Sequence, residues 1–283
     1  MGTLQEDGVS TGEREGAAVP KLRDGIEVRH CHGLAEIERC MELEREVWAS
    51  TDLDLVPSTI FVVAEETGGQ VLGAFDHTAG GKMAGFTLAM AGFHGEQRYL
   101  HSHMTAVVPA YQNRGIGRML KLFQRTDALR RGIALVEWTF DPLEIRNAYF
   151  NIVRLGAIVR RFIPNVYGIT SSPLHSGLPT DRLLAEWWLS SPRVVAAVEK
   201  GAVESQPAPA AASPGEAPVR ILVPREMPEW KVSDRTKAAD VQRQIGEEFQ
   251  EWFGRGYAVT SLELNSDGGW YSLRPVADPQ RIA

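Results

Sequence analysis

A glycine turn at residues 112–117, with the sequence Gln-Asn-Arg-Gly-Ile-Gly, has the residue types and spacing to bind a phosphate group. It follows the apolar run 104–109 and precedes apolar residues that recur at helical spacing over 116–123. A strand, a tight turn and a helix in that order direct backbone N–H groups and the positive end of the helix dipole at one point. The glycines permit unusual backbone angles and leave room for a ligand, although a plain strand-to-helix turn has a similar composition.

Two nucleotide-binding motifs do not explain this turn. A Walker-type P-loop requires Lys and then Ser or Thr after its last glycine, whereas Gly117 is followed by Arg118 and Met119. A dinucleotide-binding turn requires a third glycine three residues after the second, where this chain has Leu120. The wider sequence around the turn is therefore needed to interpret it.

The wider string from Val108 to Leu120, VPAYQNRGIGRML, resembles the signature of the GNAT superfamily of acyl-CoA-dependent N-acyltransferases. That signature is Q/R-x-x-G-x-G/A after a strand ending in V-x-P, and Gln112, Gly115 and Gly117 occupy its three defining positions. The resemblance covers roughly residues 26–190. Within it, the run 99–189 resembles a little-characterised bacterial subgroup of predicted acetyltransferases, through the strings HSHM at 101–104, EWTFDP at 137–142 and LPTDR at 178–182.

The resemblance implies a binding site for acetyl-CoA or CoA as the acyl-donor cosubstrate, without a metal. The strand before the turn is expected to separate from its neighbour, so that backbone groups of Thr105, Ala106 and Val107 bind the pantetheine arm and the thioester oxygen. The turn is expected to hold the pyrophosphate through Gln112, Asn113, Arg114, Gly115, Ile116, Gly117 and Arg118. Asn147 and Asn151 are expected to contact the pantetheine arm, with helix capping or an exposed polar position as the alternative.

The reaction also requires a base. An alkylamine with a pKa near ~10.4 is almost fully protonated at pH 7, so the enzyme must remove a proton and stabilise the oxyanion that forms. His101 is the first candidate, because it lies on the strand before the turn, near the place where some family members carry a catalytic carboxylate. His103 lies two residues further and on the same side, although either imidazole could instead be a hydrogen-bonded core residue. Glu137, a carboxylate in the apolar run 134–138, is the second candidate, with an ion pair as the alternative.

The general acid is the point at which this chain departs from the family. Many members carry a tyrosine four residues before the glycine that closes the last helix, where it protonates the departing thiolate. Four residues before Gly156 this chain has Ile152, and the nearest phenols are Tyr149 and Tyr167. We assign the role to Tyr149, although a CoA thiolate is a good leaving group and can depart without an acid.

Composition excludes several classes of protein. The 283-residue chain is 43% hydrophobic and has a net charge of −6, which is typical of a globular protein, and no basic run indicates nucleic-acid binding. No stretch approaches the ~18 apolar residues of a membrane span, and no hydrophobic leader is evident, which favours a cytoplasmic protein. Cys40 is predicted to be a buried core thiol. Cys31 stands between His30 and His32, but three consecutive residues cannot easily converge on one ion, so no metal site is predicted.

The predicted fold is α/β (α+β), with a GNAT-like mixed, mostly antiparallel sheet flanked by helices. Strands are expected at 26–30, 60–65, 71–75, 83–91, 98–108, 134–140, 157–163 and 181–189. Helices are expected at 34–48, from 116 to about 130, and at 142–155. A hairpin is expected to join 60–65 to 71–75. Compared with the family, this gives either an additional short strand at 71–75 or a bent hairpin before the strand that leads to the glycine turn.

Four segments follow from composition. Residues 1–24 are polar and rich in Gly and Glu and are predicted to be disordered, 25–200 form the acyltransferase domain, and 201–218 are an Ala/Pro-rich linker. Residues 219–283 are predicted to form a small β-α-β-β appendage. An appendage of this size is marginal for independent folding, so we expect it to dock on the main domain or on a partner subunit, for example in a homodimer.

Two functions are compatible with these features. The first is transfer of an acyl group, most simply acetyl, from acyl-CoA to a small-molecule or peptide amine by direct attack in a ternary complex. The alternative is a non-catalytic acyl-CoA-binding sensor or assembly module on the same fold, suggested by the missing tyrosine and the additional tail. The acceptor is expected to be selected by loops around 49–58, 92–98 and 164–180, and these do not reveal it.

Overall fold

The computed structural model describes residues 24–48, 55–168, 176–203 and 218–281. The predicted disordered segment, most of the predicted linker, and parts of the loops at 49–58 and 164–180 lie outside these residues. In the described part of the chain, ten strands form one sheet in the order β1-β2-β3-β4-β5-β7-β6-β9-β10-β8. Neighbouring strands pair antiparallel except for β4 and β5, which are parallel, so the predicted mixed, mostly antiparallel sheet is confirmed.

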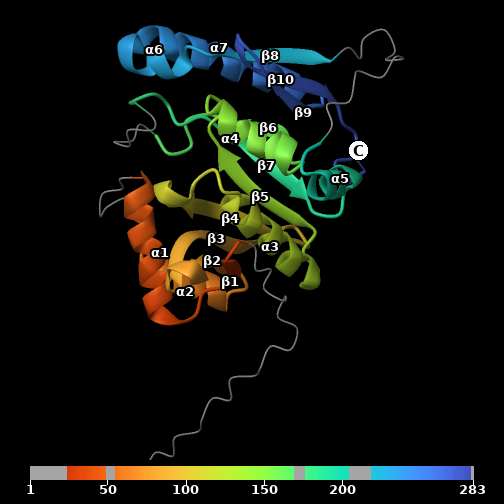
Figure 1. Cartoon of the computed structure of the whole chain (residues 1–283). Helices are drawn as coiled ribbons and strands as arrows, with labels where there is room; N and C mark the ends of the chain where they lie inside the picture. Colours follow the sequence, from red (N-terminus) through yellow and green to blue (C-terminus); the bar gives the residue numbers. More distant parts are fainter. Residues whose placement is uncertain (1–23, 49–54, 169–175, 204–217, 282–283) are drawn as a thin grey trace, which may run out of the picture.

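Strands and helices are interspersed along the chain (Figure 1). The strands are β1 (Ile26–His30), β2 (Gln70–Asp76), β3 (Lys82–His94), β4 (Gln97–Val107), β5 (Leu135–Phe140), β6 (Ile158–Ile163), β7 (Arg182–Trp188), β8 (Val219–Pro224), β9 (Tyr257–Leu264) and β10 (Gly268–Pro275). The helices are α1 (Gly33–Trp48), α2 (Ser58–Glu66), α3 (Ile116–Arg130), α4 (Ile145–Tyr149), α5 (Pro192–Lys200), α6 (Met227–Ser233) and α7 (Arg235–Gly254). The shorter turns are the 3₁₀ turns η1 (His77–Ala79) and η2 (Pro109–Tyr111) and the π-helical turn η3 (Phe150–Arg154).

Helices cover both faces of the first four strands. Helices α1 and α2 contact each other and pack on β2, β3 and β4, whereas α3 packs on β1 to β4. Every residue of β2 is buried, which requires cover on both faces of that strand. We therefore assign α3 to the face opposite α1 and α2, with the cores of both layers meeting at the sheet.

The predicted strand at 60–65 is wrong, because these residues belong to helix α2. Phe61 and Ala64, three residues apart, are buried, whereas Val62 and Val63 are exposed, which is a helical and not an alternating pattern. A short run of β-branched and aromatic residues does not distinguish a strand from a buried helix. The strand predicted at 71–75 is present as β2, but without a strand at 60–65 the described residues hold one strand fewer before the glycine turn than expected.

Helix α5 was not predicted, although its ends carry clear signals. The Ser191 hydroxyl accepts a hydrogen bond from the backbone N–H of Val194, and Pro192 occupies the first turn. Gly201 ends the helix with a φ of 83°. These are the usual residues for the start and the end of a helix, so they could have revealed this one.

The C-terminal strands continue the sheet beyond β6, at the top of Figure 1. Strand β9 pairs with β6 at Val159 and Val259, and helix α7 packs on β6 with the rings of Phe162 and Phe249 stacked at 6.3 Å. The amide of Gln242 donates to the carboxylate of Asp181 over 2.8 Å. Buried residues on both sides of the predicted linker form one hydrophobic cluster, so the appendage packs on the main domain of the same chain.

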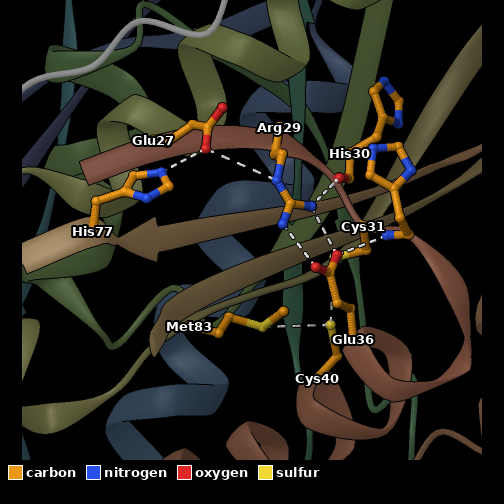
Figure 2. A network of polar contacts seen from close by, with 9 residues as sticks. Glu27, Arg29, His30, Cys31, Glu36, Cys40, His77 and Met83 are labelled. Carbon is orange, nitrogen blue, oxygen red and sulfur yellow. Dashed lines mark hydrogen bonds and ion pairs between the residues drawn. The ribbon is translucent and has the colours of Figure 1, made fainter. Parts of the chain in front are cut away.

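The start of the sheet is tied to α1 by a polar network (Figure 2). The Arg29 guanidinium donates two hydrogen bonds, of 2.7 and 2.8 Å, to the carboxylate of Glu36, which also accepts from the backbone N–H of His32. Cys31 and Cys40 are both buried, with 3.9 Å between their sulfur atoms, as predicted for Cys40. In residues 24–48 and the other described ranges, no cluster of His, Cys, Asp and Glu is arranged to hold a metal ion. Among the same residues, no helix has both the length and the apolar character to cross a membrane.

Candidate functional site

The parallel strands β4 and β5 pair over a short distance and then separate. Their described residues are in register at Tyr99 with Leu135, Leu100 with Val136 and His101 with Glu137. Beyond these pairs β4 continues to Val107, and β5 pairs on its other edge with β7. Backbone groups of β4 after His101 therefore face an opening in the sheet instead of a partner strand.

A β-bulge lies where the strands separate. In the register between β3 and β4, Leu88 faces Met104 and Ala89 faces Ser102, so that His103 is an additional residue of β4. A bulge bends its strand and redirects the side chain of the additional residue. His103 is exposed at the mouth of the opening. His101 and His103 therefore do not follow the simple alternation expected of a regular strand, although their ring centroids are only 6.3 Å apart.

The glycine turn closes one end of the opening. Asn113 and Gly115 have φ values of 61° and 80°, in the left-handed region that few residues other than glycine and asparagine adopt. Helix α3 begins directly after Gly115 without a capping side chain, so the N–H groups of its first turn are available to a ligand. The Gln112 amide donates to the carbonyl oxygen of Val107 over 3.1 Å, which ties the turn to the end of β4. A Cβ atom at Gly117 would meet only Val107, at 3.9 Å, so the turn is open on this side.

A cleft of about 1100 Å³ runs from the glycine turn to the point where β4 and β5 separate. The predicted catalytic residue His103 lines it, together with most of the predicted donor site, namely Thr105, Ala106, Val107, Gln112, Asn113, Gly115, Ile116, Gly117, Arg118, Asn147 and Asn151. The other wall comes from β5, α4 and η3, and Val47 and Trp48 of α1 reach the cleft from the opposite face. The structure therefore brings residues from six separate stretches of the chain to one cavity, namely 47–48, 102–107, 111–121, 138–154, Tyr167 and Arg182.

Three predicted catalytic residues, and Arg114 of the predicted turn site, are not among the residues that line the cleft. Glu137 lies in the closed part of the sheet, where its buried carboxylate is 2.9 Å from the Nε2 atom of His94. Tyr149 packs against the hydrophobic cluster, and His101 belongs to the last paired position of β4 and β5. The side chains of His101, Glu137 and Tyr149 therefore do not line this cleft, and their catalytic roles stay predictions.

Removal from solvent shifts the pKa values of His101 and His103, the two histidines of β4, in the same direction. His103 has exposed surface at the mouth of the opening, but the protein around its ring removes part of the solvent, and this desolvation lowers its pKa below the ordinary value. The pKa of His101 is also lowered, first by burial and then by the nearby charges of His103 and Lys121. Both imidazoles are therefore neutral at pH 7 and able to accept a proton, but His103 is the one that lines the cleft.

The wall formed by α4 and η3 carries groups suited to a polar, anionic ligand. Asn151, one of the residues that line the cleft, is only 2% exposed, and its buried Nδ2 atom has no hydrogen-bond partner among the described residues. Buried donors usually have a partner, so this atom is suited to an acceptor on a ligand. Arg146 and Arg154 also line the cleft and are exposed, and neither takes part in an ion pair within the described chain. The Arg118 side chain instead donates to carbonyl oxygens of Ala197 and Val198 in α5.

The sequence did not single out three residues of this cleft that carry chemistry, Ser102, Lys121 and Arg182. Lys121 was hidden by its place on the apolar face of α3, where it is 4% exposed. Tyr167, which was considered as a general acid but not chosen, does line the cleft, with its hydroxyl 3.4 Å from that of Thr139. The sequence could have indicated Lys121, because a lysine on the buried face of a predicted helix is unusual and lysine is rarely buried without a partner.

Solved structures of acetyltransferases are similar to this chain. A GNAT family acetyltransferase from Elizabethkingia anophelis with acetyl-CoA bound is 16% identical over 59% of this chain and 99% of that one, with a TM-score of 0.45. Arabidopsis thaliana NAA60 in complex with acetyl-CoA is 16% identical over 58% and 99%, with a TM-score of 0.47. The ribosomal-protein alanine N-acetyltransferase of Escherichia coli is 15% identical over 66% and 99%, with a TM-score of 0.45.

No protein-family model and no curated protein matches the chain. At identities of 15% and 16%, a structural similarity carries no information about the acceptor or the catalytic residues.

Proposed function

We propose that this protein transfers an acetyl group from acetyl-CoA to an amine, by direct attack of the amine while both substrates occupy the cleft. The observation that carries the proposal is the opening between β4 and β5, which leads to an uncapped helix N-terminus. Such a cleft fits a long donor that has a pyrophosphate near its middle and a reactive thioester at one end.

The glycine turn supports binding of the pyrophosphate. Backbone N–H groups at the start of α3 and the positive end of its dipole stabilise negative charge. The exposed guanidinium groups of Arg146 and Arg154, on the facing wall, add positive charge beside the turn. The side chain of Arg118 holds the end of α5, so we assign its contribution to the backbone N–H.

The open edge of β4 supports binding of the pantetheine arm. Thr105, Ala106 and Val107 pair with β3 on one edge, and the other edge faces the cleft. An extended arm with two amide groups can bind such an edge as an additional strand does. Asn151 fits this arm, because its partnerless Nδ2 atom can donate to an amide carbonyl. Asn147 lines the same wall.

His103 is the residue that we propose as the base, in place of His101. It lies at the bulge, where an amine entering from the α1 side would meet the thioester, and its lowered pKa keeps it neutral at pH 7. Neutral imidazole can take a proton from the attacking ammonium, directly or through a water molecule. Free N–H groups of β4 at the opening are the candidates for stabilising the oxyanion.

Isothermal titration of CoA and acetyl-CoA into the protein tests donor binding. Gly117→Glu should abolish binding, because the new side chain fits without a clash yet places a carboxylate in the pyrophosphate site. Gly254→Glu is the matched control, since a side chain at that position also meets nothing and lies at the end of α7. The proposal fails if CoA does not bind, or if both variants bind it as the wild type does.

Measurement of acetyl transfer distinguishes an enzyme from a non-catalytic acyl-CoA sensor. Release of CoA from acetyl-CoA can be followed with a thiol reagent in the presence of spermidine, lysine-containing peptides and peptides with free N-termini. Binding of CoA without acetylation of any amine in such a panel would favour the sensor.

A further inference from the structure

A buried lysine and a serine form a pair at the narrow end of the cleft. The Nζ atom of Lys121 lies 2.7 Å from the hydroxyl oxygen of Ser102 and 3.0 Å from the side-chain oxygen of Gln124. The same atom lies 4.1 Å from the centre of the Trp138 ring. Ser102, Lys121 and Trp138 all line the cleft, although each is less than one tenth exposed.

We propose that this pair returns a proton to the sulfur of CoA when the thioester breaks, with the Ser102 hydroxyl in contact with the sulfur and Lys121 as the proton source behind it. The inference rests on the proposed function. Lys121 acts through Ser102, so it is a positioning residue and a proton reservoir, not a group that touches the substrate.

The position of Ser102 along β4 fits this role. Ser102 is the first residue after the last pair between β4 and β5, and Val107 ends the strand beside the glycine turn. The five residue steps from Ser102 to Val107 span up to about 17 Å, shortened by the bulge at His103, which is comparable to the length of an extended pantetheine arm between the pyrophosphate and the thiol of CoA. A donor with its pyrophosphate at the turn therefore places its sulfur near Ser102.

The proton transfer balances without a further reactant. When the tetrahedral intermediate collapses, the C–S bond breaks and its electron pair goes to sulfur. The sulfur takes the proton of the Ser102 hydroxyl, while the Ser102 oxygen takes a proton from the ammonium of Lys121. The neutral Lys121 is then recharged by the proton that the acceptor ammonium released to solvent.

Acidity favours the transfer in this direction. Burial lowers the pKa of Lys121 to about 7, whereas an ordinary thiol has a pKa near ~8.5. The ammonium of Lys121 is therefore a stronger acid than the thiol that it would help to form. An unshifted lysine, with a pKa near ~10.4, would be a weaker acid than that thiol.

Few charged groups lie close to the ammonium of Lys121. In the described residues no ion pair includes it, and its partners on α3 and β5, Gln124 and Trp138, are uncharged. His101 of β4 is the titratable neighbour, since the charge of Lys121 contributes to its lowered pKa. The two acids of the cleft wall, Asp141 and Glu144, lie 3.5 and 3.0 Å from the ammonium of Lys231 in α6.

The test compares donors whose leaving groups differ in their need for a proton. Lys121→Met keeps a similar volume and removes the proton source. With acetyl-CoA and the panel amine that the wild type turns over fastest, this variant should lower kcat by about 100-fold or more. With S-(4-nitrophenyl) thioacetate, whose thiolate needs no proton, variant and wild type should differ little. Ser102→Ala should show the same selectivity, and Tyr167→Phe should not.

A pH profile with acetyl-CoA gives a second readout. In the wild type kcat should fall as the pH rises through the pKa of Lys121, and this fall should be missing in Lys121→Met. Equal losses with both donors, or an unchanged kcat with acetyl-CoA, would overturn the inference. Selectivity in Tyr167→Phe alone would transfer the role to that phenol. Absence of CoA binding to the wild type would instead defeat the proposed function, so the two failures are distinguishable.

Discussion

The hydroxyl of Tyr271, close to the end of the chain, donates a hydrogen bond of 2.7 Å to the carbonyl oxygen of Pro142. Tyr271 is fully buried in β10, and Pro142 follows Asp141 in the wall of the cleft. Lys231 of α6 reaches Asp141 and Glu144 in the same wall. The C-terminal appendage therefore holds the segment between β5 and α4, and the cleft depends on it.

Removing that hydroxyl should weaken the whole fold. Tyr271→Phe leaves the buried carbonyl of Pro142 without its donor, so the free energy of unfolding should fall by about 1–2 kcal/mol. Urea denaturation followed by tryptophan fluorescence measures the change. Tyr167→Phe, at a residue 52% exposed, should change stability by less than about 0.5 kcal/mol. Equal stability of Tyr271→Phe and wild type would mean that the appendage does not brace this segment.

The glycine turn should tolerate no side chain at residue 115. Gly115 has a φ of 80°, and a Cβ atom added there would have no neighbour within 4 Å, so the cost of Gly115→Ala comes from backbone strain alone. The expected loss of stability is about 1–2 kcal/mol, together with weaker CoA binding as the turn rearranges. Gly254→Ala, in α7, should be neutral or slightly stabilising, because its φ lies outside the left-handed region. Thermal melts and calorimetry on the two variants measure both effects, and matching results would contradict the strain argument.

The proposed base, His103, can be identified from the acidic limb of a plot of kcat/KM against pH. Only neutral His103 accepts a proton, so kcat/KM should fall as the pH falls through its pKa, which lies below the ordinary value of about 6.5. His103→Gln should lower kcat/KM by about 100-fold and remove that limb. His101→Gln should retain the limb, because the pKa of His103 is lowered by desolvation and not by the charge of His101. A limb that disappears only in His101→Gln would return the role to His101.

The free energy of unfolding should also depend on pH because the ammonium of Lys121 is buried. Its pKa is about 7 in the folded protein, while an unfolded lysine has a pKa near ~10.4. The unfolded chain therefore binds more protons between these two values, so the wild type gains stability as the pH rises from 7 to 10. The free energy of unfolding of Lys121→Met, relative to that of the wild type, should be highest below pH 7. This difference between the two proteins should decrease by up to about 4 kcal/mol by pH 10. Urea midpoints of both proteins across this range measure it, and a constant difference would mean that Lys121 keeps its charge.

Local patterns were sufficient to predict the glycine turn and the helix that follows it. The string at 112–117 places glycine where the turn needs a positive φ, and the apolar residues of 116–123 specify the helix that follows. Most strands were found for the same reason, since alternation and turn residues act over a few neighbours. The run at 60–65 failed because its β-branched residues suit a strand, while packing on β2 and β3 selected a helix.

The residues that gather where β4 and β5 separate were decided only by tertiary structure. The bulge at His103, the separation of β4 from β5, and the contact of Glu137 with His94 all depend on which strands lie side by side. No local pattern carries that information, because strand pairing joins residues far apart in the chain. The sequence by itself therefore determined the glycine turn and its helix. Only packing decided that Ser102 and Lys121 meet in the cleft while His101, Glu137 and Tyr149 do not line it.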